Sequence, residues 1–529
     1  MAPNMRQDMP PGETASERVP LIDDRDRGEG WKEEGQDERS GEQSGGRGFF
    51  TVDDAVSGLG VGWFQVLMML VVGFCALGEG ANATVAAFVA PAVKCEWRLT
   101  DKQESLLTVW VFVGLLIGAY LWGALADIMG RKVSLMAATV GGILTSTLAA
   151  VMPTIGWLEF MFALMGFTFA GQFSGLTYLL EFVPAAHRGM WGVAAGLFWS
   201  AGILGNAATA WLVMPWHGWQ GLMVITNIPY VVVLLLFPLV PESAHYLTAA
   251  GRSEEALKSL RWAARLNGTQ LPEGELVVPA VEEDDSENEC RHCSSKIGKF
   301  LSDSARLVSD SLWLTTLLVM VLYVCANVVY NIILLLTTQI HTKQTSTCEG
   351  QVFSLSAEDF REVLIVSSAD LAGNVLPVFI IDFIGRKWSM FALSGGVVVS
   401  LLPVVFAGTG LNPTWPLFAA RTLTAAWNNV LTVYSPEVFP TEIRVASAGL
   451  GKMFGAFGSM PSGFVAQGLF DKHGIRASVG VLLALTGSSM LWEACLPIET
   501  TGKPLQGNVL EDGKEREGQG EREGLDVEV

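Results

Sequence analysis

The chain is poor in charged residues. Asp, Glu, Lys and Arg make up 16% of its 529 residues, whereas soluble domains hold about 25%. Half of the residues are hydrophobic, and the mean hydropathy is +0.38. These values exclude an ordinary soluble domain and indicate a protein with many membrane helices. Basic residues are scarcer than acidic ones, 34 against 53, which argues against nucleic-acid binding.

Cysteine is scarce as well. Seven cysteines in 529 residues do not form a disulfide scaffold. Only Cys95 and Cys348 fall in loops that we place on the non-cytosolic side, and either a disulfide or two separate thiols fits them. Cys290-Arg-His-Cys293 has metal-like spacing, but no second pair follows it, and a structural zinc normally needs four ligands. We predict no metal site and no cofactor.

Apolar residues are rare in three segments that hold almost all of the net negative charge. Residues 1–50, 271–289 and 499–529 carry −5, −8 and −5 of the total of −19. Such segments cannot bury enough apolar surface to fold alone, so we expect disordered acidic regions in the cytosol. Residues 1–50 also lack the apolar core of a cleaved signal peptide. The first membrane helix is therefore expected to direct insertion.

What the chain does contain is a duplicated pair of motifs. Asp-x-x-Gly-Arg-Lys recurs after 255 residues, and a Glu followed seven residues later by Arg recurs after 256. Two chance motifs would not keep this register, and a duplicated unit of membrane helices is a common transporter architecture. The motif residues are Asp127, Gly130, Arg131, Lys132, Glu181 and Arg188 in the first copy, and Asp382, Gly385, Arg386, Lys387, Glu437 and Arg444 in the second.

Twelve apolar runs are long enough to cross a bilayer as helices. The basic motif residues fall in or beside the short loops after even-numbered runs, which places these loops, both termini and the central linker in the cytosol. We predict an all-α membrane protein of two pseudo-symmetric six-helix bundles, 58–247 and 312–498, with a tail (1–57), a linker (248–311) and a second tail (499–529). The runs lie near 63–90, 104–125, 133–152, 156–182, 190–214, 219–240, 312–338, 360–383, 388–408, 414–436, 445–470 and 475–497.

Part of the linker is expected to be helical. Residues 253–268 begin with Ser253 as an N-cap, have acids in the first turn and bases late, and end at Gly268. This pattern is typical of a short helix. The helix is amphipathic, and we expect it to lie against the cytosolic face of the bundle.

The segment from Gly123 to Lys132, which contains the first motif, resembles the signature between the second and third helices of the major facilitator superfamily. Residues 382–387 resemble the second copy of that signature. Segments 95–99, 241–247, 434–444 and 496–502 are similar to the synaptic vesicle 2-related group, among the organic ion and sugar carriers. The resemblance spans about residues 58–506. It implies two six-helix bundles that move a small solute between them.

We predict that the duplicated motifs gate the cytosolic side. An Asp at a helix end, with Arg and Lys in the following turn, can pair internally or with neighbouring helix ends, and this would bias the equilibrium between inward-open and outward-open states. Such pairs contribute more where the loop is partly dehydrated. Glu181 with Arg188, and Glu437 with Arg444, are expected to act similarly. Simple positive-inside topology is the alternative, but it leaves Asp127 unexplained.

Ionisable residues within membrane spans are costly and are functional candidates by default. Glu79 lies among small residues in the first span, Asp370 in the eighth and Arg421 in the tenth. We predict that Glu79 binds a cationic group or a proton, and the resemblance also implies an acid, usually Asp, at this position. Asp370 and Arg421 either contact the solute or form a salt bridge, and one pair can do both.

Amide and phenol groups inside spans need a polar cavity or a hydrogen bond to another helix. Both roles fit several such residues at helical spacing in the seventh span and others in the first and tenth. They complete the predicted solute-binding or proton-coupling set, which thus adds Asn82, Asn327, Tyr330, Asn331 and Asn428.

A short pattern in the N-terminal tail predicts sorting. Glu17-Arg-Val-Pro-Leu21-Ile22 fits the acidic dileucine signal that clathrin adaptor complexes bind. It would direct the protein to endosomal, lysosomal or vesicular membranes. The alternative is a chance match in the tail of a protein that remains in the plasma membrane.

These observations predict a secondary active or facilitative transporter of a small, charged organic solute, with protons or a counter-ion as coupling partners. Many proton-coupled relatives have an arginine in the fourth helix where this chain has Phe162, which favours facilitated or exchange transport over simple symport. The alternative is a non-transporting vesicle protein that uses the same fold as a receptor or structural component. An enzyme is not indicated, since no phosphate-binding loop or catalytic constellation occurs.

Overall fold

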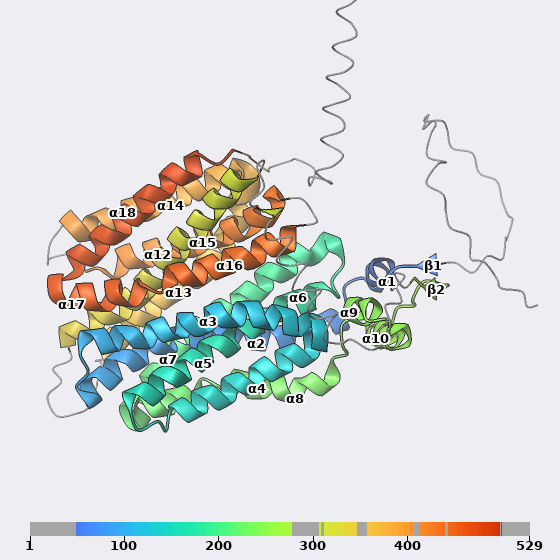
Figure 1. Cartoon of the computed structure of the whole chain (residues 1–529), viewed down its shortest axis with the longest axis horizontal. Coiled ribbons are helices and arrows are strands. Elements are labelled where there is room, and N and C mark those ends of the chain that lie inside the picture. The colour runs from blue at the N-terminus through green and yellow to red at the C-terminus, as the bar shows by residue number, and fades with distance from the viewer. Residues whose placement is uncertain are drawn as a thin grey trace, which may run out of the picture. The chain divides into compact units, whose positions relative to one another are not determined.

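The structure is a computed structural model that describes residues 49–277, 306–307, 312–345, 357–406, 412–439, 443–497 and 499. Two groups of long helices build the membrane part, with the blue-to-green helices on one side and the yellow-to-red helices on the other (Figure 1). The first half contains α2 (Trp63–Trp97), α3 (Asp101–Met129), α4 (Arg131–Ala149), α5 (Ile155–Gln172), α6 (Ser174–Leu180), α7 (Arg188–Ile225) and α8 (Ile228–Leu236), with 3-10 turns at Ala185–His187 and Phe237–Leu239.

The second half repeats this order. It contains α12 (Trp313–Thr345), α13 (Ala357–Ile384), α14 (Arg386–Phe406), α15 (Thr414–Val438), α16 (Arg444–Ser459), a π-helical turn (Phe464–Leu469), α17 (Phe470–His473) and α18 (Ile475–Ala494). In the first half α2 packs on α7 and α3 on α5, and in the second half α12 packs on α16 and α13 on α15. Equivalent helices thus pair in the same way, as the duplicated motifs predict.

The two halves meet through equivalent helices too. Contacts between them run along α7 with α13 and along α3 with α16. We call the end of the bundle that holds Gly130 and Gly385 the motif end, and the end that holds Glu104 and Gln339 the opposite end. Because helices of both halves pack along this interface, a residue that lies in it can contact both halves.

Each predicted apolar run falls on helical residues, with shifted boundaries. Among the described residues, nine helical stretches are long and apolar enough to cross a membrane. One of them, Ala185–Leu239, is 55 residues long and contains both the predicted fifth and the predicted sixth span. The backbone leaves the helical conformation at Gly218, whose φ is 63°, and this kink separates the two spans. Helices α15 and α16 are not among the nine. The helical fold is confirmed, and the number of twelve crossings stays a prediction.

Small elements cover the motif end of the first half. They are β1 (Phe49–Phe50), α1 (Val52–Leu59), α9 (Ala244–Ala249), α10 (Ser253–Asn267) and β2 (Glu275–Leu276), and β1 pairs with β2 in parallel. Residues 49–57, which we had assigned to the disordered tail, are thus part of the fold. Helix α10 is the predicted linker helix and ends at Gly268 with φ 71°, but its N-cap is Arg252 and not Ser253.

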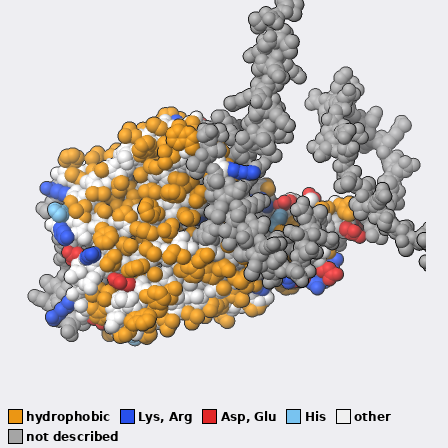
Figure 2. Space-filling model, in the orientation of Figure 1, with side chains coloured by type: hydrophobic (Ala, Val, Ile, Leu, Met, Phe, Trp, Pro, Cys, Tyr) orange, Lys and Arg blue, Asp and Glu red, His pale blue; other side chains and the backbone are white. Residues whose placement is uncertain are grey.

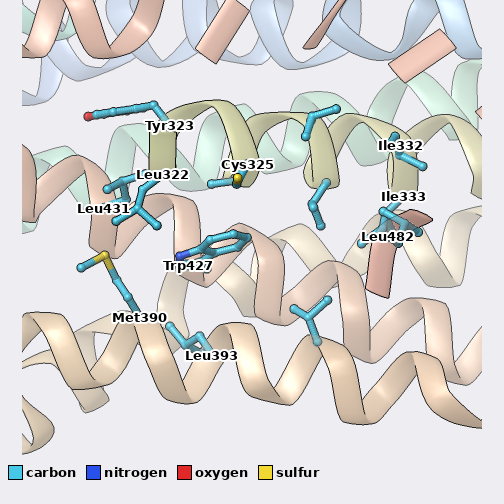
Figure 3. Close-up of a cluster of buried hydrophobic side chains, with 14 of the residues drawn as sticks. Leu322, Tyr323, Cys325, Ile332, Ile333, Met390, Leu393, Trp427, Leu431 and Leu482 are labelled. Carbon is cyan, nitrogen blue, oxygen red and sulfur yellow. The ribbon is translucent and has the colours of Figure 1, made fainter. Parts of the chain in front are cut away.

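The surface has the character of a membrane protein. Hydrophobic side chains cover the flank of the bundle, and the charged residues visible in Figure 2 gather toward its two ends. Large exposed apolar side chains include Ile117, Leu235 and Phe406. Beneath this surface each half has its own apolar core, and in the second half Trp427 packs among Leu322, Leu431 and Met390 (Figure 3).

Candidate functional site

A glycine turn between α3 and α4 organises the first copy of the gate motif. Gly130 has a φ of 98°, which side chains rarely adopt, and a Cβ here would lie 2.5 Å from Oε2 of Glu242. The backbone N–H of Lys132 donates to Oε1 of Glu242 at 2.9 Å. The carboxylate therefore caps the N-terminus of α4, where the helix dipole favours negative charge.

The basic side chains tie this turn to neighbouring helix ends. Nη1 of Arg131 lies 2.8 Å from Oδ1 of Asp127, and its Nε lies 3.3 Å from Oε1 of Glu181. Nζ of Lys132 donates to the carbonyl oxygen of Val240 at 2.7 Å. These bonds hold the ends of α3, α4, α6 and α8 together within the first half.

The second copy repeats the arrangement between α13 and α14. Gly385 has a φ of 89°, and the backbone N–H groups of Arg386 and Lys387 donate to Glu499 at 2.9 and 3.1 Å. Nε of Arg386 lies 3.1 Å from Oε2 of Glu437. The repeated sequence thus produces a repeated local structure.

Two predicted motif residues of the second half cannot be compared with the first. The side chains of Asp382 and Arg444 lie outside the part that the structure describes. Lys387 can be compared. Its Nζ donates to the carbonyl oxygen of Leu496 at 2.7 Å, as Nζ of Lys132 donates to a carbonyl oxygen in the first half.

The predicted pair of Glu181 with Arg188 is wrong. Glu181 binds Arg131 and accepts the hydroxyl of Ser243. Nε of Arg188 donates to the carbonyl of Val183 at 3.1 Å, and its Nη2 lies 3.4 Å from Asp53. The 3-10 turn that precedes α7 points the guanidinium toward the end of α6 and toward α1, a helix that the sequence reading had placed in the tail.

Glu242 and Glu499 were absent from the predicted set. Both lie in segments that carry the family resemblance, and their spacing of 257 residues is within two of the spacings of the duplicated motifs, 255 and 256. Glu242 also influences Tyr246 on α9, whose hydroxyl donates to the carbonyl of Ile128 at 2.7 Å. Partial burial, followed by the negative charge of Glu242, raises the pKa of Tyr246.

Glu79 lies near the middle of α2 and is 6% exposed. The small residues beside it would be expected to open space around the carboxylate, but other helices pack directly against the two glycines. A Cβ on Gly78 would lie 2.3 Å from the ring of Tyr230, and a Cβ on Gly80 would lie 2.1 Å from the carbonyl oxygen of Trp199. Close helix packing thus surrounds the carboxylate, whose described hydrogen-bond contact is Cys75 Sγ at 4.0 Å.

Asp370 and Arg421 form a salt bridge inside the second half. Nη2 of Arg421 lies 2.6 Å from Oδ2 of Asp370, and both side chains are at most 3% exposed. The hydroxyl of Tyr330 donates to the other carboxylate oxygen, Oδ1, at 3.2 Å. The structure therefore shows the salt-bridge alternative, with Tyr330 as a third member.

Two of the four predicted amides join helices, and the other two bond within their own helix. Nδ2 of Asn331 donates to Oγ of Ser459 on α16 at 3.0 Å, and Nδ2 of Asn428 donates to the carbonyl of Ala326 on α12 at 3.2 Å. Asn82 and Asn327 donate to the carbonyl four residues earlier in their own helices. In the described part of the structure, the side-chain N–H groups of these four asparagines donate to oxygens of the protein itself.

Lys452 and Glu493 are two ionisable residues within predicted spans that sequence reasoning left out. Lys452 on α16 reaches across to the first half, where its Nζ lies 4.6 Å from the ring centroid of Phe173, and it interacts electrostatically with Glu79. Glu493 on α18 is fully buried and accepts the hydroxyl of Ser394 at 2.7 Å. The sequence signal that could have identified both residues is a charged side chain inside a predicted membrane span.

Hydrogen bonds between the halves lie at the opposite end and at mid-height. Nε2 of Gln339 donates to Oε1 of Glu104 at 2.6 Å, and Oγ of Ser105 donates to the carbonyl of Gly463 at 3.3 Å. Further along, Nδ2 of Asn374 donates to the carbonyl of Gly196 at 3.0 Å. The bonds of Gln339 and Ser105 thus hold the halves together at the opposite end.

Several sequence predictions cannot be placed. Glu17, Leu21 and Ile22 of the sorting pattern, the Cys290–Cys293 segment and Cys348 lie outside the described residues. Cys95 is disulfide-bonded, and its predicted pairing with Cys348 stays a prediction. Among the described residues, no group of His, Cys, Asp and Glu is arranged to hold a metal ion.

Comparison with known proteins gives consistent matches along most of the chain. A family model described as "Sugar (and other) transporter" matches residues 61–505. The chain is 32% identical over 484 residues to "Organic cation/carnitine transporter 7" of Arabidopsis thaliana, which covers 87% of this chain and 96% of that relative. It is 29% identical over 492 residues to "Synaptic vesicle 2-related protein" of Bos taurus, which covers 89% and 85%. A solved structure of the xylose transporter XylE from E. coli, in a partially occluded inward-open conformation, superposes with a TM-score of 0.65 at 16% identity, covering 84% of this chain and 100% of that one.

Proposed function

Because this chain belongs to the sugar and other transporter family of the major facilitator superfamily, we propose that it carries a small organic solute with a positive charge by alternating access. The observation that carries the proposal is Glu79, a carboxylate 6% exposed in the membrane part that forms no ion pair with the described residues. Burying such a charge costs several kcal/mol unless a ligand, a proton or water compensates it.

The position of Glu79 supports solute binding in preference to a purely structural role. The buried charges of Asp370 and Arg421 are paired with each other at 2.6 Å. Glu79 instead has its electrostatic partner, Lys452, on α16 of the second half. A group between two moving halves can meet the solute from either side.

The positions of the bonds between and within the halves support alternating access. The hydrogen bonds of Glu104 with Gln339 and of Ser105 with Gly463 join the halves at the opposite end, whereas the gate motifs bind helix ends within one half. This arrangement fits a state that is closed at the opposite end. In the complementary state these contacts would separate and the motif ends would approach, and the solute must bind the two states differently to shift them.

We place the motif end in the cytosol. Arg131, Lys132, Arg386 and Lys387 all lie there, and short cytosolic loops are enriched in Lys and Arg. The acidic dileucine pattern then lies in the cytosol as well, within reach of adaptor complexes. A vesicular membrane is the location that this pattern and the synaptic vesicle 2-related relatives favour.

Uptake into liposomes by the purified full-length protein tests the proposal. The panel comprises organic cations, organic anions and sugars, with and without a pH gradient. We expect saturable uptake of cations that Glu79→Gln abolishes. Glu159→Gln, the same change at a partly exposed carboxylate near the start of α5, should leave uptake intact.

Uptake that Glu79→Gln leaves unchanged would remove Glu79 from the mechanism. Folded protein that transports no member of the panel would instead favour a non-transporting vesicle protein. Stimulation by the gradient would identify protons as the coupling ion.

A further inference from the structure

Helix α10 carries a row of basic residues on its outer face. From residue 258 to its end the helix contains Lys258, Arg261 and Arg265 and no acidic residue, and all three side chains are exposed. The apolar face of the helix, which includes Leu260 and Ala264, packs into the core of the first half. The basic residues therefore lie on the side that this packing leaves open.

The three bases have no acidic partner in the described part of the chain, where they form no ion pair. The acids of α10, Glu254 and Glu255, lie in its first turn, and Glu255 is paired with Arg252 at 2.7 Å. A favourable interaction with the helix dipole accounts for Arg265 in the last turn, but not for Lys258 in the middle of the helix. The row is therefore free to bind an anionic ligand.

Trp262 places this row at the height of the lipid headgroups. Its Nε1 donates to the carbonyl oxygen of Leu239 at 3.2 Å, at the end of the turn that follows α8 (Figure 1). Leu235 and Leu239 are 73% and 48% exposed, so this flank of the bundle faces lipid. The indole is 41% exposed and continues the flank where the span ends. An exposed Trp at the end of a span is typical of the membrane–water interface.

Lys258 and Arg265 flank the indole. They lie four residues before and three residues after Trp262, which are the spacings of neighbours on a helix surface. The seven residues between them correspond to about 10 Å along the axis. Lysine and arginine have long side chains whose charged ends can extend to the headgroups while the helix lies below them. Two cations around an interfacial Trp match the chemistry of an anionic phospholipid headgroup.

We propose that Lys258 and Arg265 bind the headgroup of an anionic phospholipid in the leaflet at the motif end, with Trp262 as the interfacial anchor. In the orientation given above this is the cytosolic leaflet, where anionic lipids are concentrated. The site acts on the first half, because Asn267 at the end of α10 accepts the backbone N–H of Phe64 in α2 at 2.8 Å. A bound lipid thus fastens the first half to its leaflet, whatever the solute.

Hydrogen exchange of the purified full-length protein tests the site. The protein is reconstituted in nanodiscs of phosphatidylcholine and in nanodiscs that also contain phosphatidylserine, and the exchange of residues 253–267 is compared. We expect phosphatidylserine to slow exchange in α10 about tenfold, because two basic groups then interact with an anionic surface. Inorganic phosphate added to the phosphatidylcholine nanodiscs should not reproduce this protection.

Variants assign the protection to the two bases. Lys258→Gln combined with Arg265→Gln should remove most of it. Lys258→Arg combined with Arg265→Lys, which keeps both charges, should retain it. The matched control is Lys472→Gln combined with Arg476→Gln, the same loss of charge at exposed residues of the opposite end, and it should leave the protection unchanged.

Three results would overturn the inference. One is equal exchange of α10 in the two kinds of nanodisc. Another is protection that survives the loss of both bases, which would assign it to the general surface charge. The third is protection by inorganic phosphate in phosphatidylcholine, which would identify a soluble anion as the ligand. Because none of these measurements involves uptake, the proposed function stands or falls separately.

Discussion

Arg421 and Asp370 are joined by a salt bridge of 2.6 Å in which both side chains are at most 3% exposed. Removing either partner leaves an uncompensated charge in the interior, which costs about 3–5 kcal/mol. We expect Asp370→Asn and Arg421→Met each to lower the free energy of unfolding by that amount, and the double variant to regain much of it. Thermal unfolding of the purified protein measures this cycle. Additive losses would show that the pair is not coupled.

The turn glycines should resist substitution. Gly130→Ala places a Cβ 2.5 Å from Glu242 at a φ of 98°, and we expect a loss of about 1–3 kcal/mol from strain and a displaced cap. Gly123→Ala is the matched control, because a Cβ there meets nothing within 4 Å. We expect Gly130→Ala to have a lower melting temperature than Gly123→Ala. Equal values would contradict the role of the turn.

The two capping carboxylates should be equivalent. Glu242→Gln and Glu499→Gln each remove a negative charge that accepts backbone N–H groups at the start of α4 or α14, and we expect each to cost about 0.5–2 kcal/mol. Because the sites lie in different halves, the two losses should add in the double variant. Glu254→Gln in the exposed first turn of α10 serves as control. A clear loss in one half alone would refute the equivalence.

Opening of the opposite end should depend on Gln339. Gln339→Leu removes the bond to Glu104 at 2.6 Å and leaves Glu104 paired with Lys94. A hydrogen bond to a charged group contributes about 1.5–3 kcal/mol, so the ratio of open to closed protein should rise about tenfold or more. Spin labels at Leu212 and Arg361 report the distance between halves. A label pair within the first half, at Leu121 and Leu212, should not change.

Acid should loosen α1. Asp54 accepts the backbone N–H and hydroxyl of Thr51, and these bonds hold its pKa below the ordinary 3.8. A lowered folded pKa means that the stabilisation is present above pH 3.8 and is lost as the pH falls through the folded value. Hydrogen exchange of residues 52–59 should accelerate below that pH. Thr51→Val should accelerate exchange at neutral pH and weaken the dependence.

The general architecture was predictable because it rests on long apolar runs and a repeated motif. The apolar runs placed the long helices but not α1, which lies largely in the predicted tail, and the spacing of Gly130 and Gly385 placed the two turns. The N-cap of α10 was missed by one residue, since Arg252 adopts the capping backbone while Ser253 already lies in the helix. Such a difference depends on the path of the preceding chain, which a local pattern does not contain.

Partners across the fold were harder to predict than the residues themselves. Glu181 was a candidate, yet it binds Arg131, which is distant in sequence, in place of nearby Arg188. Lys452 lies within the predicted span 445–470 and was not among the candidates. Only the packing of α16 against the first half brings it near Phe173 and Glu79. The sequence supplies charges, and the arrangement of helices decides which of them meet.

The pairing of β1 with β2 ties the beginning of the first half to its end. Val277 donates its backbone N–H to the carbonyl of Phe50 at 2.9 Å, although 227 positions separate them. The short strands at the beginning and at the end of the first half are thereby held side by side. Local unfolding of residues 49–50 should therefore release residues 275–277 as well, so that the entry to the first half and its exit open as one unit.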